Sequence, residues 1–188
     1  ASANWARSAA EVESILKLLT TFLEREGAAL AAANLQCRVI GRRDRLPPRL
    51  HAAIQAVEAA TRDGRGLQLR LAVDYSARHE IAVAAANAIG RWAPGVPPNA
   101  ALIAGLIEQH LDAEAGPVDL LIRTGGERRL SDFLLWESAC AELYFTRTPW
   151  PEFGARGLRR ALAAYARRRR TFGRSAPVEH QLSARVSA

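Results

Sequence analysis

The sequence predicts an α/β protein with a largely parallel central sheet flanked by helices. Three short apolar segments, at 35–40, 67–73 and 118–122, have the length and branched composition of strands. Helical patterns separate them, and strands joined through helices need crossover connections, which place the strands parallel to one another. Ligands of such sheets bind at the carboxyl ends of the strands, so the loops after the strands are the expected position of a functional site.

Helices and strands follow one another in a regular order along the chain. A capping box formed by Ser8 and Glu11 begins the first helix, Pro47 opens the second, and Asn99 is a typical N-cap for the fourth. Apolar residues at helical spacing predict helices over 9–33, 47–63, 78–92 and 99–111, a short helix from about 132 and a final helix from about 155. A brief strand is predicted at 143–145.

Length and composition indicate one globular domain. The chain has 188 residues, of which 49% are hydrophobic, and a protein of this size can bury about 70% of the surface that its unfolded chain exposes. We expect the domain to span 1–173 and 174–188 to form a flexible tail. Cys37 and Cys140 lack metal-ligand spacing, which favours two buried thiols in a reducing compartment. No apolar run is long enough to span a membrane, so a cytoplasmic protein is expected.

The net charge of +7 is unevenly distributed. Residues 1–155 carry 17 basic and 18 acidic side chains, whereas 156–188 carry 9 basic side chains and 1 acidic one. A surface that follows nucleic-acid phosphates spreads its cations over the fold, so no nucleic acid is expected as a partner. Arginines of the predicted last helix could instead contact anionic lipid at a membrane surface, or could simply be solvated. They are Arg159, Arg160, Arg167, Arg168, Arg169 and Arg170.

The loop at 123–131 has the composition of a phosphate site. It follows a predicted strand and combines three arginines, two adjacent glycines and a serine at a predicted helix start. Guanidinium groups bind phosphate oxygens in pairs, and glycines let backbone N–H groups approach the ligand. A tight turn with solvated arginines is the alternative. Glu142 ends an apolar stretch and needs a cationic partner, either magnesium bound together with substrate phosphates or a nearby arginine.

Two further loops add arginines to the same edge of the predicted sheet. Asn4, Trp5 and Arg7 precede the capping box, and the run 74–78 follows the second strand and ends in an arginine. An asparagine and an arginine could bind an anion or relay a proton, although a helix cap explains 74–78 more simply. Three loops with arginine favour a polyanionic ligand more strongly than one loop does.

These segments together resemble the cis-prenyltransferase family, typified by undecaprenyl diphosphate synthase. The similarity is carried by 118–136, which contains Arg-Thr-Gly-Gly-Glu, and by 141–146 and 150–153. Asn4-Trp5-Ala6-Arg7 is similar to the family's Ser-Ser-Glu-Asn-Trp-x-Arg segment, and 66–78 is similar to the segment that ends in Asn-Tyr-Gly-Gly-Arg. The resemblance covers the chain to Gly173 and implies the cis-prenyltransferase fold.

The resemblance implies an activity, a cofactor and a set of site residues. Isopentenyl diphosphate would condense with an allylic diphosphate, with the help of Mg²⁺, to give a cis-polyprenyl diphosphate. A homodimer is implied, as is an apolar tunnel for the product, lined by helix 9–33 and by strand residues such as Leu69 and Leu71. The site residues, carried over one by one, are Asn4 for proton removal, Trp5, Arg7, Arg123, Arg129, Leu130 and Ser131 for substrate binding, and Glu142 for magnesium.

The chain also departs from the family pattern. The family begins with a strand and an Asp-Gly-Asn-Gly-Arg motif whose Asp binds metal and the allylic diphosphate. Nothing before Ala1 supplies this segment, so the first strand is expected to be missing and this chain alone is not expected to catalyse. Asp74 stands where the family often has Asn, and Ser76-Ala77 replaces Gly-Gly. Two alternatives stay open: irregular coupling of two allylic diphosphates on the same fold, and a non-catalytic accessory subunit.

Overall fold

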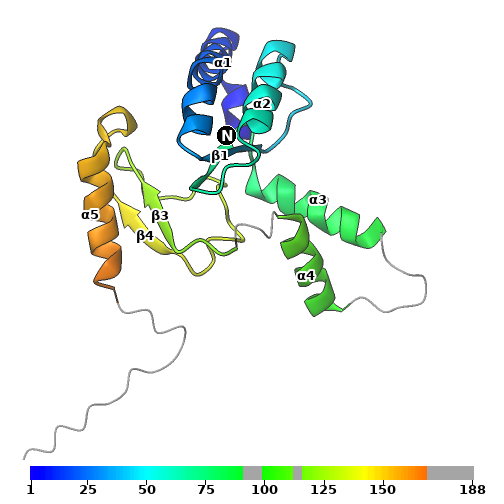
Figure 1. Cartoon of the computed structure of the whole chain (residues 1–188). Helices are drawn as coiled ribbons and strands as arrows, with labels where there is room; N and C mark the ends of the chain where they lie inside the picture. The colour runs from blue at the N-terminus through cyan, green and yellow to red at the C-terminus, as the bar shows by residue number, and fades with distance from the viewer. Residues whose placement is uncertain (91–98, 112–115, 169–188) are drawn as a thin grey trace, which may run out of the picture. The chain divides into compact units, whose positions relative to one another are not determined.

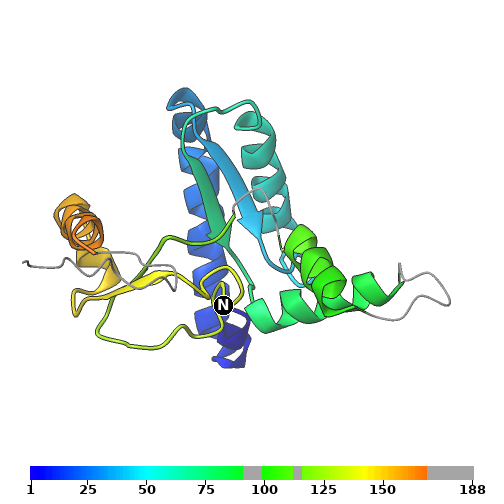
Figure 2. The same cartoon turned by 90° about the horizontal axis from the view of Figure 1, so that it is seen from below.

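The computed structural model describes residues 1–90, 99–111 and 116–168 (Figures 1 and 2). Its helices and strands are η1 (Ser2–Ala6), α1 (Ala9–Ala32), β1 (Gln36–Ile40), α2 (Pro48–Ala60), β2 (Gln68–Ala72), α3 (Ala77–Gly90), α4 (Ala100–His110), β3 (Leu120–Arg123), β4 (Glu142–Phe145), η2 (Trp150–Glu152) and α5 (Ala155–Ala166). They fall into two compact units. The first unit contains Ala1–Asp119 and Arg129–Ala141, and the second contains Leu120–Arg128 and the chain from Glu142 onward.

The core of the first unit lies between β1 and the helices α1 and α2. The strands β1 and β2 are parallel, with Val39 opposite Leu71, and α1 and α2 pack against each other and against β1 (Figure 1). A Cβ atom at Gly27 of α1 would lie 2.9 Å from a methyl group of Val57, so the small residue permits this close helix packing. The buried core side chains are Leu23, Cys37, Val39, Leu46, Leu50, Ala53, Ile54 and Val57.

Side chains of α2 occupy the edge of β1 that does not pair with β2. The backbone N–H of Cys37 donates to Oγ1 of Thr61 at 3.0 Å, and that of Val39 donates to Oε1 of Glu58 at 2.9 Å. Arg43 donates to the Val39 carbonyl at 2.8 Å and forms an ion pair with Glu58 at 2.6 Å. Backbone groups of the β1 edge are therefore satisfied by side chains rather than by another strand.

Helices α3 and α4 pack against each other in the first unit. The side chain of Asn99 accepts a hydrogen bond from the backbone N–H of Ala101 at 2.8 Å, which confirms Asn99 as the N-cap of α4. At the start of α1, Ser8 is the N-cap, because the Glu11 backbone N–H donates to Ser8 Oγ at 3.4 Å. The Glu11 carboxylate accepts from the Ser8 hydroxyl at 3.2 Å rather than from the Ser8 backbone, so the two residues of the predicted capping box pair in a different way.

The second unit is built on β3, β4 and α5. The two strands are parallel, with Leu120 opposite Glu142 and Arg123 opposite Phe145. Helix α5 packs against β4 and buries Ala161 completely. Parallel strands are therefore confirmed, and within the described residues they form two two-stranded sheets.

Several expectations from the sequence are wrong in detail. No helix begins at 132; the chain from Ser131 to Cys140 forms successive bends and turns. Ser131, Asp132 and Leu134 have φ angles of 54°, 60° and 46°, which a right-handed helix does not permit. Cys37 is buried as expected, but Cys140 is exposed.

The arginine-rich end of the chain also differs from the prediction. Helix α5 ends at Ala166, so Arg167 and Arg168 follow the helix rather than belonging to it. Arg169, Arg170 and the predicted tail 174–188 lie outside the described residues. Within the described part of the chain, no helix has the length and apolar character that crossing a membrane requires.

Candidate active site

The first group of candidate residues lies on η1, at the carboxyl ends of β1 and β2. Asn4 and Trp5 belong to this short helix, and Arg7 follows it directly. The helix is attached to the loop after β2, because the backbone N–H of Ser2 donates to the Tyr75 carbonyl at 2.9 Å. Trp5 packs against the core of the first unit. The structure therefore places η1 at the carboxyl ends of the parallel strands, where the sequence predicts ligand-binding loops.

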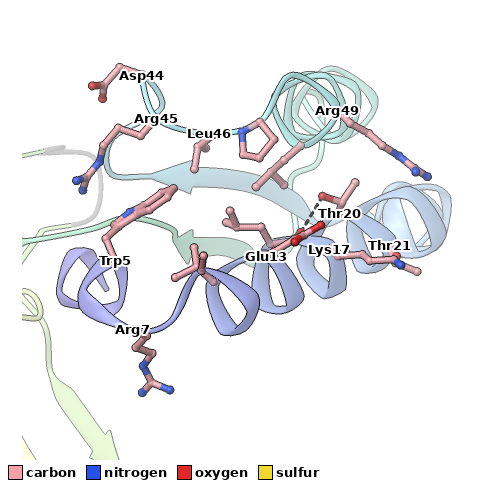
Figure 3. A pocket seen from close by; sticks show the side chains of 15 residues that line it. Trp5, Arg7, Glu13, Lys17, Thr20, Thr21, Asp44, Arg45, Leu46 and Arg49 are labelled. Carbon is pink, nitrogen blue, oxygen red and sulfur yellow. Dashed lines mark hydrogen bonds between the residues drawn. The ribbon is translucent and has the colours of Figure 1, made fainter.

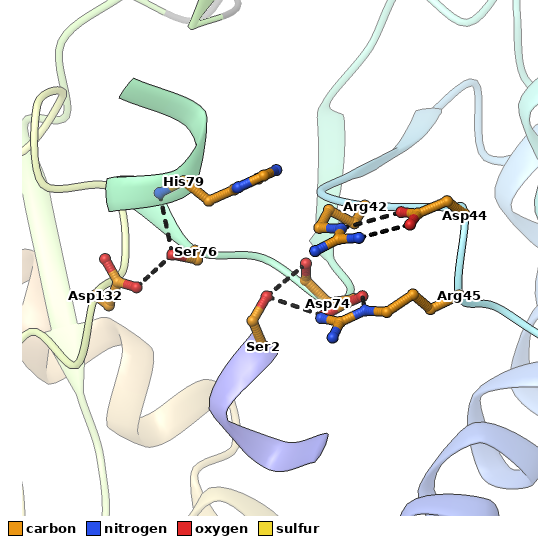
Figure 4. Close-up of polar contacts among 8 residues, drawn as sticks. All are labelled: Ser2, Arg42, Asp44, Arg45, Asp74, Ser76, His79 and Asp132. Carbon is orange, nitrogen blue, oxygen red and sulfur yellow. Dashed lines mark hydrogen bonds and ion pairs between the residues drawn. The ribbon is translucent and has the colours of Figure 1, made fainter. Parts of the chain in front are cut away.

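The carboxylate of Asp74 holds η1 in place through Ser2 (Figure 4). Its oxygens accept two hydrogen bonds from Arg45, at 2.8 and 2.5 Å, and one from Ser2 Oγ at 2.9 Å. The Arg45 guanidinium in turn lies 5.0 Å from the centre of the Trp5 ring, within the range of a cation–π interaction. The Asp74 side chain is only 2% exposed, so this is a buried ion pair with its hydrogen bonds largely satisfied.

The pKa of the Asp74 carboxyl group is lowered, which favours its charged form. Burial acts to raise the pKa of its carboxyl group, but hydrogen bonds from Arg45, Ser2 and Trp5 outweigh burial and hold the pKa below its ordinary value. Asp74 also has a φ of 49°, a left-handed conformation that non-glycine residues adopt rarely and that is common at functional sites.

A pocket of about 910 Å³ opens beside η1 and runs along α1 (Figure 3). Trp5, Arg7 and Arg45 lie at one end of it, as Figure 3 shows. Its apolar lining comes from α1, from α2 and from the loop before α2, through Val12, Leu16, Leu46, Pro47 and Leu50. Helix α1 therefore lines a cavity as predicted for the tunnel, whereas Leu69 and Leu71 pack against the core cluster instead. Charged side chains also line the pocket along α1 and α2, among them Glu13, Lys17 and Arg49. The pocket therefore combines cationic groups with apolar surface, as a ligand with a charged head and a hydrocarbon chain requires.

The second group, Arg129, Leu130 and Ser131, also belongs to the first unit. The segment 129–132 is attached to the start of α3 through Asp132 (Figure 4). Oδ2 of Asp132 accepts a hydrogen bond from Ser76 Oγ at 2.6 Å, and Oδ1 accepts one from the backbone N–H of Arg78 at 2.9 Å. Arg129 and Ser131 are exposed, so they can reach a ligand in solvent.

Burial acts to raise the pKa of Asp132, but the hydrogen bonds from Ser76 and from the Arg78 backbone prevail and lower it. Asp132 is therefore ionised at neutral pH and lies beside the N-terminus of α3, where a negative charge is favourable. The serine expected at a helix start is not a helix cap, because no helix begins at 132; the hydroxyl that caps a helix here belongs to Ser76.

Arg123 and Glu142 lie in the second unit. Arg123 ends β3, and its loop is fixed by the hydrogen bonds of the Gly125 and Gly126 N–H groups to the carbonyls of Thr148 and Thr146, both at 2.9 Å. Gly125 and Gly126 both have a φ of 79°, which explains the glycine pair in the predicted phosphate loop.

Glu142 is not directed into an apolar interior. It begins β4, its side chain is 29% exposed, and it forms an ion pair with Arg168 at 2.5 Å. Arg168 also donates to the Leu143 carbonyl at 2.9 Å. Of the two partners that the sequence leaves open for Glu142, the structure shows the arginine. The described residues contain no group of three or more histidine, cysteine or acidic side chains that could hold a metal by themselves.

The structure thus joins Asn4, Trp5 and Arg7 on one short segment and Arg129, Leu130 and Ser131 on another, both within the first unit. Sequence reasoning missed Arg45 and Asp132, which hold these segments. Arg45 lies 29 residues from its partner Asp74, so spacing alone gives no sign of the pair. The one available signal was Asp74 itself, an acidic residue in an otherwise arginine-bearing loop.

The structure is thus an α/β protein with arginine-bearing segments at the carboxyl ends of parallel strands, beside a pocket of mixed apolar and charged lining. Residues 1–173 match the model of the family described as "Putative undecaprenyl diphosphate synthase". The chain belongs to this family of cis-prenyltransferases, and the prenyl-transfer activity expected from the sequence resemblance is confirmed at the level of the family.

Individual relatives agree with this assignment. Isoprenyl transferase 1 of Bradyrhizobium diazoefficiens is 49% identical over 172 residues, which is 90% of this chain and 67% of the relative. The undecaprenyl-diphosphate synthase of Escherichia coli K12, named as specific for (2E,6E)-farnesyl diphosphate, is 38% identical over 94% of this chain and 70% of its own length.

Two solved structures are similar as well. A probable undecaprenyl diphosphate synthase from Campylobacter jejuni gives a TM-score of 0.79 at 34% identity, with 92% of this chain and 79% of that chain covered. Lavandulyl diphosphate synthase from Lavandula x intermedia, in complex with dimethylallyl diphosphate, gives a TM-score of 0.81 at 35% identity, with 92% and 75% covered.

Proposed function

We propose that the protein condenses isopentenyl diphosphate with an allylic diphosphate to form a cis-polyprenyl diphosphate. The observation that carries this proposal is the pocket beside η1, which has Trp5, Arg7 and Arg45 at one end and apolar side chains of α1 and α2 along its wall. An allylic diphosphate has the same division into an anionic head and an apolar tail. Arg7 would bind the head, Arg45 would hold Trp5 in place from its ion pair with Asp74, and the apolar wall would bury the growing chain.

In the proposed reaction, a carbon–carbon bond forms between the allylic carbon and isopentenyl diphosphate, the bond from that allylic carbon to its diphosphate breaks, and inorganic diphosphate leaves. The isopentenyl unit loses a proton as the new double bond forms and keeps its own diphosphate in the product. Arg129 and Ser131 would bind the diphosphate of isopentenyl diphosphate from segment 129–132, with Leu130 between them, and Arg123 would contribute from its own loop. Arginine and hydroxyl donors stabilise the negative charge of a diphosphate. Asn4 would orient the group that accepts the proton.

Glu142 would supply a protein ligand for Mg²⁺. Its carboxylate is an oxygen donor of the kind that magnesium prefers, and it is partly exposed, which fits a metal that keeps substrate phosphates and water as its other ligands. The metal would neutralise charge on the departing diphosphate. Because Arg168 contacts the same carboxylate, metal binding would compete with this ion pair.

The test is a product analysis with radiolabelled isopentenyl diphosphate and either dimethylallyl or farnesyl diphosphate, with and without a chelator. We expect polyprenyl diphosphates with cis double bonds, and we expect their formation to require Mg²⁺. A branched product formed from dimethylallyl diphosphate alone would instead indicate irregular coupling. Wild-type rates after Arg129→Ala and Glu142→Ala would contradict the site assignment.

We also propose two kinds of association. The first is a homodimer, which sedimentation velocity would detect as a species of twice the chain mass. The second is contact with anionic membranes through α5, where exposed Arg156, Arg159 and Arg160 accompany partly exposed Leu158 and Leu162. Equal binding to neutral and anionic vesicles would contradict the second proposal.

A further inference from the structure

The turn that follows β2 contacts both segments that carry the candidate substrate residues, through Ser2 of η1 and through Asp132 (Figure 4). On one side, Asp74 and Tyr75 hold η1: the Asp74 carboxylate and carbonyl each accept from Ser2 Oγ at 2.9 Å, and the Tyr75 carbonyl accepts from the Ser2 N–H at 2.9 Å. The next residue, Ser76, lies on the other side and bonds to Asp132. Three consecutive residues therefore link two segments that are far apart in the sequence.

The contact with segment 129–132 has several parts. Besides the 2.6 Å hydrogen bond from Ser76 Oγ to Asp132, the backbone N–H of Ala77 donates to the Asp132 carbonyl at 3.0 Å. The rings of Tyr75 and Phe133 meet edge to face, with centroids 5.8 Å apart. These contacts hold Asp132 and Phe133 directly after Ser131. Residues 131 and 132 have left-handed conformations, which are costly unless the surroundings enforce them.

The contact with η1 is equally specific. Arg45 donates to Asp74 from two nitrogens of its planar group, Nε and Nη2, and places the same group against the Trp5 ring. A bidentate arginine fixes direction as well as distance, which a lysine cannot do. The orientation of Trp5 therefore depends on the Asp74 carboxylate through Arg45.

We propose that the turn 74–76 is a positioning bracket for prenyl transfer. Through Asp74 and Arg45 it fixes η1, and through Ser76 and Asp132 it fixes segment 129–132. The bracket holds the two substrate-binding segments in a set register, as a reaction between two bound substrates requires, because a displacement of about 1 Å can cost about 100-fold in rate. This inference rests on the proposed function, and none of the bracket residues needs to touch a substrate.

Each arm of the bracket has its own variant and matched control. Ser76→Ala removes the contact to Asp132 together with the N-cap bond to the His79 N–H, and Asn99→Ala removes an N-cap bond from α4 without touching segment 129–132. Arg45→Ala breaks the contact to Asp74, and Arg43→Ala breaks the ion pair with Glu58, in which the arginine has the same 34% exposure. Each control therefore removes a comparable hydrogen bond or ion pair, but leaves the contacts of η1 and of segment 129–132 intact.

The measurement is steady-state kinetics with each substrate varied in turn, together with the NMR signal of the Trp5 indole N–H, assigned with Trp5→Phe. We expect Ser76→Ala to raise KM for isopentenyl diphosphate about fivefold, the effect of one lost hydrogen bond, and to leave the Trp5 signal unmoved. We expect Arg45→Ala to lower kcat about 10- to 100-fold and to shift the Trp5 signal, and Arg45→Lys not to restore either. Both controls should keep wild-type kinetics and the wild-type Trp5 signal.

The proposal is overturned if Ser76→Ala leaves KM for isopentenyl diphosphate unchanged, or if Arg45→Ala affects kcat no more than Arg43→Ala does. Failure of the proposed function looks different, because the wild-type protein would then make no labelled product. In that case the arms are judged by the Trp5 signal and by calorimetric binding of inorganic diphosphate, which Ser76→Ala should weaken and Asn99→Ala should not. Unchanged diphosphate binding in Ser76→Ala, together with an unmoved Trp5 signal in Arg45→Ala, would overturn the bracket independently of activity.

Discussion

Two carboxylates, one in each compact unit, are each paired with an arginine, but their surroundings differ. Asp74 is 2% exposed and accepts hydrogen bonds from Arg45 and Ser2, whereas Glu142 is 29% exposed and is paired with Arg168. A buried carboxylate whose oxygens both accept hydrogen bonds from the protein is not available to bind a ligand, and its loss destabilises the fold. An exposed one can exchange its partner at little cost. The comparison separates a carboxylate that holds the site from one that can serve in the reaction.

The largest expected effect is on activity, at the exposed carboxylate. Glu142→Ala should lower kcat/KM about 100-fold or more, because a metal contributes several kcal/mol of charge stabilisation in the transition state. The free energy of unfolding should change by less than about 1 kcal/mol, since the lost ion pair is partly exposed. Steady-state kinetics and urea unfolding measure the two quantities. Glu24→Ala, which removes another arginine-paired carboxylate of 38% exposure, is the control and should leave kcat/KM unchanged.

The second prediction concerns stability at the buried carboxylate. Asp74→Ala should lower the free energy of unfolding by about 3 kcal/mol, because Arg45 and Ser2 lose their partner in a buried site. Asp44→Ala, which breaks an ion pair with Arg42 in the same loop region but at 61% exposure, should cost much less, because solvent screens an exposed pair. Equal losses in urea unfolding would show that burial does not distinguish these pairs.

The third prediction follows from the lowered pKa of Asp74. A carboxyl group whose pKa is lower in the folded than in the unfolded protein stabilises the fold above its unfolded pKa of about 3.9. This contribution is lost as the pH falls through the folded value. Asp74→Asn should therefore flatten the loss of stability below about pH 4. Acid titration followed by circular dichroism measures the slope, and an unchanged slope would contradict the assignment.

The smallest expected effect concerns the arginine that covers Glu142. Arg168→Ala should strengthen Mg²⁺ binding a few-fold, because the metal then need not displace an ion pair worth up to about 1 kcal/mol. The concentration of Mg²⁺ that gives half-maximal activity is the readout. A weaker response to Mg²⁺ would instead mean that Arg168 orients the carboxylate for the metal.

Periodicity in the sequence was sufficient for most of the fold. The predicted strand at 35–40 became Gln36–Ile40, and the predicted helix at 9–33 became Ala9–Ala32. The error at 132 has a physical cause: the apolar run Phe133–Trp136 has the composition of a helix, but left-handed residues before and within it prevent one. Tertiary contacts with Ser76 and Ala77 hold these conformations, and no local pattern reports such contacts.

The residues of the candidate site were likewise only partly predictable from the sequence. Motif resemblance identified the residues proposed to touch substrates, such as Trp5 and Arg129, because chemistry restricts their type and spacing. It did not identify Arg45, whose role depends on where the loop before α2 meets the turn after β2. Positioning contacts between distant loops exist only once the chain is folded.

The side-chain contacts along the outer edge of β1 have a consequence for how the protein behaves in a crowded solution. An edge strand with unpaired N–H and C=O groups is a template to which another chain can add a strand. Here Thr61, Glu58 and Arg43 occupy the donors and acceptors of Cys37 and Val39. The protein is thereby protected against edge-to-edge aggregation on this side, and an incoming strand would first have to break a charged network to start a fibril.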